Sequence, residues 1–340
     1  MSPLRPGVQH PGRFPVETAF VETVPAGRTL LGEIHFGASP VLPESLAHPL
    51  AWVGMPLLAG HASIELWTSQ QPVVTQRIGP LTFARNRDVL FGCFAAESPT
   101  DFTAFEARVQ EAYARLLTLV EAEGYPHLLR LWNHFPGIGD REAGLDRYMV
   151  FCRGRHQAIE VHYGGRFTGR LPAASAVGTR HGGLVIYFLA GRHPGRHREN
   201  PRQMSAYCYP SQYGPKSPSF ARATLHRQGG ADYLYISGTA SIVGHESRHP
   251  DDPVAQLDET LTNIRILIDS TAAEDGVDCK GLDSVSCVKV YIRRREHAAL
   301  IRRHLEAVLP PGAHRMFLEA DICRPELLLE IEAVARAGRG

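Results

Sequence analysis

Hydrophobic and polar positions along the second half of the chain predict one α/β unit. Apolar residues recur at helical spacing from Pro253 to Ala273, and a second helix is predicted over Arg295–Val308. β-rich runs flank these helices, at Tyr233–Gly238, Val285–Ile292, Arg315–Ala320 and Leu327–Ala335. The predicted order is therefore strand, helix, strand, helix, strand, strand.

The first half of the chain repeats this order. One amphipathic helix is predicted over Asp101–Glu123 and another near Asp140–Val161. The predicted strands are Leu30–Phe36, Ser63–Thr68, Leu90–Ala95, His127–Phe135, Ala173–Gly178 and Leu184–Ala190. The shared order, with a pair of strands closing each half, favours an internal duplication over a chance similarity of two α/β units.

Two acidic residues distinguish the last strand of the second copy. Glu330 and Glu332 stand at i and i+2 in an apolar run, so a strand directs both carboxylates to one face of the sheet. A buried carboxylate is costly unless it is paired or used, and Arg315 on the preceding strand is the expected partner. The corresponding strand Leu184–Ala190 carries no acid. The pattern fits either a salt-bridged strand end or an acid poised beside an anion-binding arginine.

A polar, irregular segment, Arg192–Arg222, connects the two copies. It contains Tyr207, Tyr213 and Lys216, which together with Arg222 could line an anion-binding pocket. Tyrosines between domains also often pack an interface while their hydroxyls stay in water. The residues alone leave both interpretations open.

Composition sets the outer bounds. The 340 residues are 44% hydrophobic with a formal net charge of +1, which is ordinary for a globular protein with room for two cores. The chain lacks the excess of basic residues that would indicate a nucleic-acid partner. It also lacks the long apolar run that would indicate a membrane helix. The six cysteines show neither a CxxC pair nor metal-ligand spacing, so reduced thiols in the cytoplasm and no metal site are expected.

The second copy, from about Ser217 to Ala335, resembles the Rid family of enamine and imine deaminases. The resemblance is carried by Ile236–Gly238, Gln256–Ile268, Val288–Ile292 and Glu330–Ala333. It implies that Arg315 and Glu330 stand at the functional arginine and glutamate positions of that family.

The whole chain resembles a narrower family, the chorismatases, which are two-copy Rid-like proteins that release pyruvate from chorismate. The stretches that carry this resemblance are Arg130–Ile138, Tyr207–Arg222, Ile236–Ser247 and Cys323–Ala333. It implies an α/β (α+β) fold of two Rid-like units, each a mixed sheet with two helices on one face, in a pseudo-trimer-like arrangement with the active site between the units. The expected division is 1–195 for an N-terminal unit without the acid, 196–222 for a tyrosine-rich loop and 223–340 for the catalytic unit.

The resemblance also implies a reaction and the residues that perform it. Glu330 would protonate the enolpyruvyl group of chorismate, and the resulting oxocarbenium ion would release pyruvate without a metal or an organic cofactor. The expected substrate-binding residues are Arg315, Arg222, Tyr207, Tyr213, Lys216, Ala240 and Arg155. Arg155 could reach the shared cleft from a helix of the first copy, although a solvated helix face is the commoner position for such a residue.

The ring product depends on two further positions. In the family, a cysteine at the place of Cys323 marks the members that form hydroxybenzoate, and Ala240 replaces the glycine of members specific for 3-hydroxybenzoate. We therefore expect pyruvate and 3-hydroxybenzoate, and leave 4-hydroxybenzoate open as a second product. The alternatives are hydrolysis to a dihydroxycyclohexadiene carboxylate, a Rid-type deaminase, and a non-catalytic module that binds a small acid. A monomer is expected, because two fused copies supply one interface of a Rid trimer within a single chain.

Overall fold

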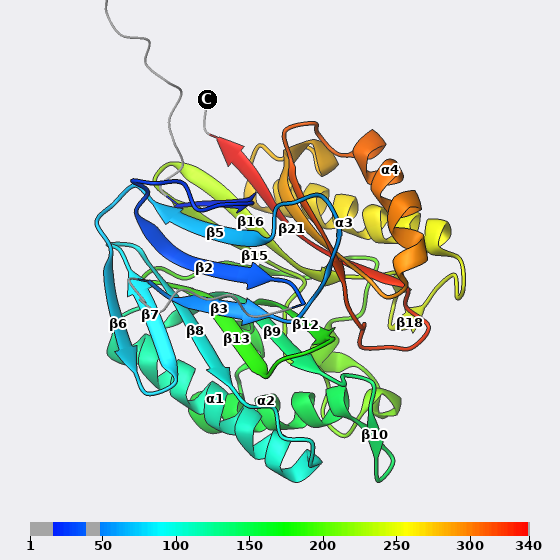
Figure 1. Ribbon diagram of the computed structural model, residues 1–340, viewed down its shortest axis with the longest axis horizontal. Helices are drawn as coiled ribbons and strands as arrows, with labels where there is room; N and C mark the ends of the chain where they lie inside the picture. Colours follow the sequence, from blue (N-terminus) through cyan, green and yellow to red (C-terminus); the bar gives the residue numbers. More distant parts are fainter. Residues whose placement is uncertain (1–15, 39–47, 339–340) are drawn as a thin grey trace, which may run out of the picture.

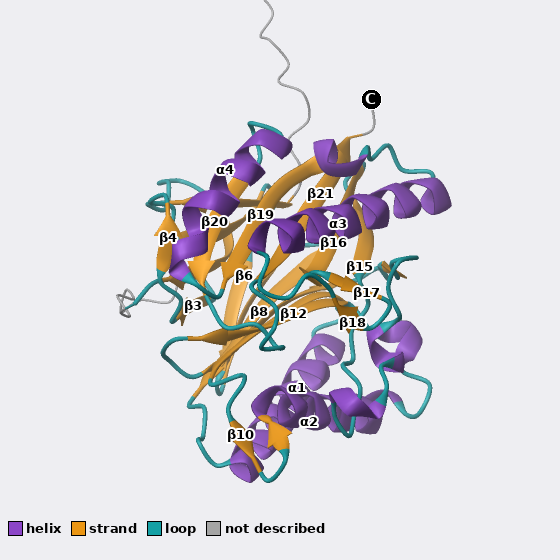
Figure 2. Ribbon diagram, turned by 90° about the vertical axis from the view of Figure 1, so that its right-hand side faces the viewer, coloured by secondary structure: helices purple, strands orange, loops and turns teal. Residues whose placement is uncertain are grey.

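The computed structural model describes residues 16–38 and 48–338, and its longer strands form three sheets around a common core (Figure 1). Two of these sheets carry helices on their outer face, as Figure 2 shows. The N-terminal sheet has the order β12-β9-β13-β8-β7-β6, and the C-terminal sheet the order β14-β15-β16-β21-β19-β20-β4.

The strands of the N-terminal sheet are β6 (Val74–Ile78), β7 (Leu81–Arg85), β8 (Val89–Ala96), β9 (His127–Pro136), β12 (Ala173–Thr179) and β13 (Leu184–Gly191). The strands of the C-terminal sheet are β4 (Leu57–Ala59), β14 (Arg196–Arg198), β15 (Ala223–Gln228), β16 (Ala231–Thr239), β19 (Val285–Ile292), β20 (His314–Glu319) and β21 (Leu329–Gly338). Short hairpins are formed by β10 (Arg141–Glu142) with β11 (Leu145–Asp146), and by β17 (Ile242–Val243) with β18 (Glu246–Ser247).

The two helix-covered sheets share one topology. In the first, β13 lies antiparallel between β8 and β9, and β9 runs parallel to β12. In the second, β21 lies antiparallel between β16 and β19, and β19 runs parallel to β20. The correspondence places the acid-free strand β13 at the position of the acid-bearing strand β21. The predicted element order and its repetition are therefore confirmed.

Two helices cover each of these sheets, as predicted. Helices α1 (Phe102–Ala122) and α2 (Arg147–Tyr163) bury their apolar sides against the N-terminal sheet, and α3 (Pro253–Asp275) and α4 (Ala298–Val308) against the C-terminal sheet. Asp101, Asp146 and Asp252 cap α1, α2 and α3, because each carboxylate accepts hydrogen bonds from backbone N–H groups of the first turn. Helix α2 begins later than predicted, because the β10–β11 hairpin occupies the residues before it. None of the helices in the described ranges is long and apolar enough to cross a membrane.

A third sheet was not part of the two-unit prediction. It has the order β1-β5-β2-β3, with β1 (Val16–Val21), β2 (Leu30–Phe36), β3 (Leu50–Val53) and β5 (Ile64–Ser69). The strands predicted near β2 and β5 were expected in the first copy, but they pair with each other in this separate sheet. Three sheets around one core give the expected pseudo-trimer-like arrangement, with the third sheet facing the inner sides of the other two (Figure 1).

A buried network of ion pairs connects all three sheets in this core. Lys289 of β19 contacts Glu65 of β5 at 2.6 Å and Glu332 of β21 at 2.7 Å, and Arg130 of β9 contacts Glu332 at 2.9 Å. Each of these four residues is at most 4% exposed. Tyr187 of β13 donates a hydrogen bond to Glu65 and accepts one from Lys289. Two acids and two cations thus compensate one another where the sheets meet.

Removal of Lys289 should destabilise the fold strongly. Lys289→Met keeps much of the side-chain volume but leaves Glu65 and Glu332 with one cation fewer between them, and breaking a buried pair in this way costs about 3–5 kcal/mol. Urea unfolding followed by tryptophan fluorescence measures the change. The double variant Glu65→Gln/Lys289→Met should recover part of the loss, because one charge of each sign is then absent. A loss below about 1 kcal/mol in Lys289→Met would contradict this role for the network.

Candidate active site

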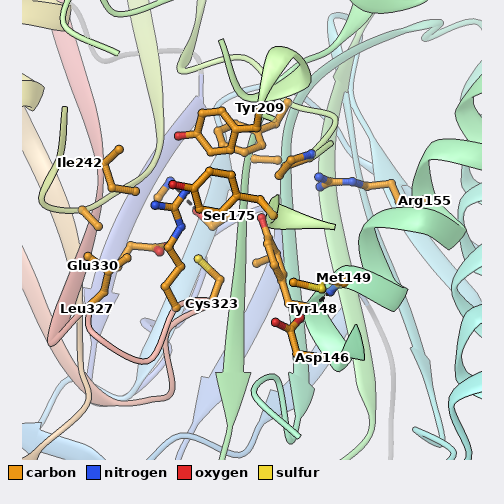
Figure 3. A pocket seen from close by; sticks show the side chains of 18 of the residues that line it. Asp146, Tyr148, Met149, Arg155, Ser175, Tyr209, Ile242, Cys323, Leu327 and Glu330 are labelled. Atoms are coloured by element: carbon orange, nitrogen blue, oxygen red, sulfur yellow. Dashed lines mark hydrogen bonds between the residues drawn. The ribbon is translucent and has the colours of Figure 1, made fainter. Parts of the chain in front are cut away.

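A pocket lies between the two helix-covered units, and both units and their connecting segment contribute to it (Figure 3). The first unit supplies Asp146, Tyr148, Met149, Arg155 and Ala174–Ala176. The connecting segment supplies Tyr209, Tyr213, Pro218, Phe220 and Arg222, and the second unit Gly238, Ala240, Ile242, Cys323, Arg324, Leu327 and Glu330. The pocket is thus at the predicted place, between the two copies.

Glu330 is the acid of this pocket, and it lies against the backbone of the neighbouring strand. A side chain on Gly238 of β16 would overlap with the Oε1 atom of Glu330, so only glycine leaves room for the carboxyl group there. The pairing of β16 with β21 is irregular between Ile236 and Thr239, which allows this close approach. The Gly238 N–H donates to Ser175 Oγ of the first unit at 2.9 Å. The position of Glu330 therefore depends on contacts between the two units.

Glu330 and Glu332 have opposite protonation states, although they lie on the same face of β21. Burial and the neighbouring charge of Glu332 raise the pKa of Glu330 to about 8, against the opposing effect of Arg130 and Arg222. Burial alone would also raise the pKa of Glu332, but Lys289 and Arg130 hold it at about 2. At neutral pH the pocket therefore contains a protonated Glu330, and the ionised Glu332 lies two residues further along the same strand.

Four hydrogen-bonding groups fix the orientation of the Glu332 carboxylate. It accepts hydrogen bonds from Arg130 Nη2 at 2.9 Å, from Trp132 Nε1 at 2.7 Å and from Ser175 Oγ at 2.6 Å, and it contacts Lys289 Nζ at 2.7 Å. Because these partners use both of its oxygens, Glu332 is a structural neighbour of the acid.

Three arginines give the pocket a positive character. Arg155 of α2 is buried, and its Nε and Nη2 atoms have no hydrogen-bond partner among the described residues. Arg222 donates through Nη2 to Met204 O and to the Tyr209 hydroxyl, whereas its Nε atom has no partner in the described ranges. Buried guanidinium N–H groups without partners are expected to bind an anionic group.

The third arginine, Arg324, contacts both the connecting segment and the second unit. Its guanidinium lies 3.9 Å from the ring centre of Tyr213 and donates to the His245 carbonyl and to Ser247 Oγ. The Tyr213 hydroxyl and His245 Nδ1 are 3.1 Å apart. The connecting segment is thereby attached to the β17–β18 hairpin of the second unit.

Cys323 carries a neutral thiol. Burial, and secondarily the nearby Glu330, raise the pKa of the Cys323 thiol to about 12. The thiol is therefore protonated at neutral pH and is neither a base nor a thiolate nucleophile.

Most of the sequence-predicted site residues line this pocket. These are Glu330, Cys323, Arg222, Tyr213, Ala240 and Arg155. Two others do not contribute to its lining: Tyr207 packs against the helix-covered core of the first unit, and Lys216 is exposed. Arg155 is buried in the pocket wall and not on a solvated helix face.

The prediction for Arg315 was wrong. On β20, Arg315 is on the same face of the sheet as Phe317, which packs in the core beneath helices α3 and α4. Met316 is on the opposite face and packs in the core that the three sheets share. Arg315 donates to the backbone carbonyls of Leu309, Pro310 and Ala313 and does not line the pocket. The cations that act on Glu330 are Arg130 and Arg222 instead.

Several residues of the site were missed in the sequence. Arg324 follows Cys323 directly, and Arg130 is the first residue of one of the stretches that carried the family resemblance. The sequence could therefore have identified both as site residues. Tyr209 also lies in such a stretch, Tyr207–Arg222. Nothing in the sequence pointed to Ser175 and Asp146, because their roles depend on contacts between segments far apart in the chain.

The fold and the site together define a class: a two-unit α/β protein with a protonated glutamate in a cationic pocket between the units. Residues 65–190 match a family model described as "Chorismatase FkbO/Hyg5-like, N-terminal". A "3-hydroxybenzoate synthase" from Streptomyces hygroscopicus is 35% identical over 322 residues, which is 91% of this chain and 92% of the relative. A "Chorismatase" from Streptomyces rapamycinicus is 37% identical over 277 residues, covering 79% of this chain and 81% of the relative.

A solved structure supports the same assignment. The crystal structure of a chorismatase superposes with a TM-score of 0.83 at 32% identity and covers 94% of this chain and 97% of its own. The chain belongs to the chorismatase family.

Proposed function

We propose that the protein is a chorismatase that converts chorismate to pyruvate and 3-hydroxybenzoate. The observation that carries the proposal is a protonated Glu330 in a pocket that also contains three arginines. Relatives of this chain are named for the same substrate and product. Chorismate is a dianion with an enolpyruvyl ether on a cyclohexadiene ring, so its cleavage needs cationic partners and a proton donor in one place.

Arg155, Arg222 and Arg324 are the partners for the two carboxylates of chorismate. Arg155 and Arg222 have N–H groups without partners among the described residues, and a guanidinium binds a carboxylate through two parallel hydrogen bonds. The Tyr209 hydroxyl holds Arg222 in place, and Tyr213 does the same for Arg324 by stacking. Binding in this pocket brings the enolpyruvyl group close to Glu330.

Glu330 supplies the proton that starts the reaction. Transfer to the methylene carbon of the enolpyruvyl group forms an oxocarbenium ion, which weakens the ether bond to the ring, and pyruvate leaves. An acid with a pKa of about 8 is protonated at neutral pH yet still able to donate. The low polarity around the buried acid also strengthens the interaction between its carboxylate and the developing cation.

The surroundings of the ring favour hydroxybenzoate over the non-aromatic diol. Cys323 and Ala240 line the pocket, and the neutral thiol fills space in which a water molecule would otherwise approach the ring. A Rid-type deaminase has less support, because Arg315 is on the other face of the sheet from Glu330.

A monomer in the cytoplasm stays part of the proposal. The three sheets close around one core within a single chain, which supports a monomer. The described cysteines are free thiols, which supports a reducing compartment such as the cytoplasm.

Glu330→Gln should abolish pyruvate release and leave folding nearly intact. The amide keeps the shape of the side chain but carries no acidic proton, and general acids contribute on the order of 10²–10⁴-fold. Pyruvate release from chorismate, coupled to lactate dehydrogenase, measures the rate. Glu246→Gln, which alters an exposed acid of the β17–β18 hairpin, is the control and should keep full activity. If Glu330→Gln retained more than about a tenth of the turnover, another group would be the proton donor.

Cys323→Ala should still release pyruvate but change the ring product. Protonation by Glu330 does not involve the thiol, whereas the smaller side chain admits water next to the ring, so the product should shift from hydroxybenzoate to the diol. Chromatography of the ring products decides this. Cys208→Ala, at an exposed thiol of the connecting segment, should leave the product unchanged. An unaltered hydroxybenzoate yield in Cys323→Ala would reduce Cys323 to a packing residue.

A further inference from the structure

One acid of the pocket, Asp146, takes no part in the protonation by Glu330. Asp146 lines the pocket from the first unit, and Figure 3 places it on the opposite side from Glu330, with Cys323 between them. Asp146 caps helix α2, because its Oδ1 atom accepts a hydrogen bond from the Met149 N–H at 2.8 Å. The cap holds the carboxylate in a fixed position while it faces the pocket.

The electrostatics of Cys323 support this placement. Glu330 and Asp146 both act on the Cys323 thiol and raise its pKa, after the larger effect of burial, so both carboxyl groups are near it. Burial also raises the pKa of Asp146 above its usual value, against smaller opposing effects of the hydrogen bond from the Met149 N–H and of Arg141. A carboxylate with a raised pKa is a better proton acceptor.

The chemistry of the proposed reaction calls for such an acceptor. Chorismate contains the same atoms as pyruvate and hydroxybenzoate together, so this route consumes no water, whereas the diol route consumes one. In the route without water, the free hydroxyl of the ring is the internal nucleophile. Its oxygen must lose a proton as it bonds to the ring carbon from which pyruvate departs.

We propose that Asp146 is the general base for this ring hydroxyl and thereby directs the reaction to hydroxybenzoate; this inference rests on the proposed function. The hydroxyl proton passes to Asp146, the oxygen bonds to the adjacent ring carbon, and the bond from that carbon to the ether oxygen breaks as pyruvate leaves. The three-membered ring then opens: the bond from the oxygen to its original ring carbon breaks, and the oxygen takes the proton back from Asp146 to become the phenol. The hydrogen on the carbon that keeps the oxygen leaves as a proton and restores Glu330.

Other pocket residues are poorly suited to this step. Cys323 is a neutral thiol, and burial raises the pKa of the Tyr148 phenol far above neutral pH, so neither accepts a proton. Glu330 donates its proton to the enolpyruvyl methylene and is restored by a hydrogen of the ring skeleton, so its carboxylate already has another proton to accept. Among the described residues that line the pocket, Asp146 is the remaining carboxylate.

The test is the ring product of Asp146→Asn. Asparagine caps a helix as well as aspartate does but cannot accept a proton, so the fold should persist. Asp101→Asn makes the same change at the cap of α1, outside the pocket lining, and serves as the matched control. Asp146→Ser supplies a second capping residue without a carboxylate if the asparagine variant folds poorly.

We expect Asp146→Asn to keep releasing pyruvate, with the ratio of hydroxybenzoate to diol at least about tenfold lower, because a general base contributes on the order of 10²–10⁴-fold. Asp101→Asn should give the wild-type ratio. An unchanged ratio in a folded Asp146 variant would overturn the inference, as would the loss of pyruvate release with no diol formed. If the wild-type protein released no pyruvate from chorismate, the proposed function itself would fail, which is a separate outcome.

Discussion

Two carboxylates and two cations buried where three sheets meet are the constraint on which the rest of this structure depends. Arg130, Glu332, Lys289 and Glu65 come from strands of all three sheets, so their pairing fixes how the sheets are placed relative to one another. Burying a charge without a partner of opposite charge would cost roughly several kcal/mol. Here each charged group has at least one such partner within 3 Å. The network therefore specifies one arrangement of the sheets.

The same network sets the chemistry of the pocket. Because Lys289 and Arg130 pair with Glu332, Glu330, two residues earlier on the same face, forms no ion pair within residues 16–38 and 48–338. Glu330 is therefore kept neutral by burial and by the adjacent negative charge. Two carboxyl groups on one strand thus have pKa values on opposite sides of neutral pH, which is a common arrangement for acid–base catalysis. The structural ion pairs and the candidate acid are parts of one electrostatic arrangement.

Local patterns in the sequence predicted much of this fold. The helical spacing of apolar residues identified α1 and α3, and the i, i+2 spacing placed Glu330 and Glu332 on one face. The third sheet was not predicted, because β2 and β5 have the same short apolar pattern as strands of the first copy and only long-range pairing separates them. Strand patterns carry no information on which sheet a strand joins.

The neighbours of the two carboxyl groups on β21 could not be predicted from the sequence for a related reason. Met316, Phe317 and Leu318 are all buried, because both faces of this sheet are covered, so no alternation revealed on which face Arg315 lies. The actual neighbours, Arg130 and Ser175, are separated from Glu332 by more than 150 residues. Their contact with this strand depends on how the two units pack together.

The pH dependence of kcat/KM for pyruvate release tests the central claim most directly. Glu330 acts in its protonated form, so kcat/KM should be constant below its pKa and fall about tenfold per pH unit above pH 8. Glu332→Gln removes the adjacent negative charge and leaves Lys289 and Arg130 less neutralised, and both changes lower the pKa of Glu330. In a Glu332→Gln protein with a native circular dichroism spectrum, the decline in kcat/KM should therefore begin at a lower pH. A decline at the same pH in both proteins would contradict the account.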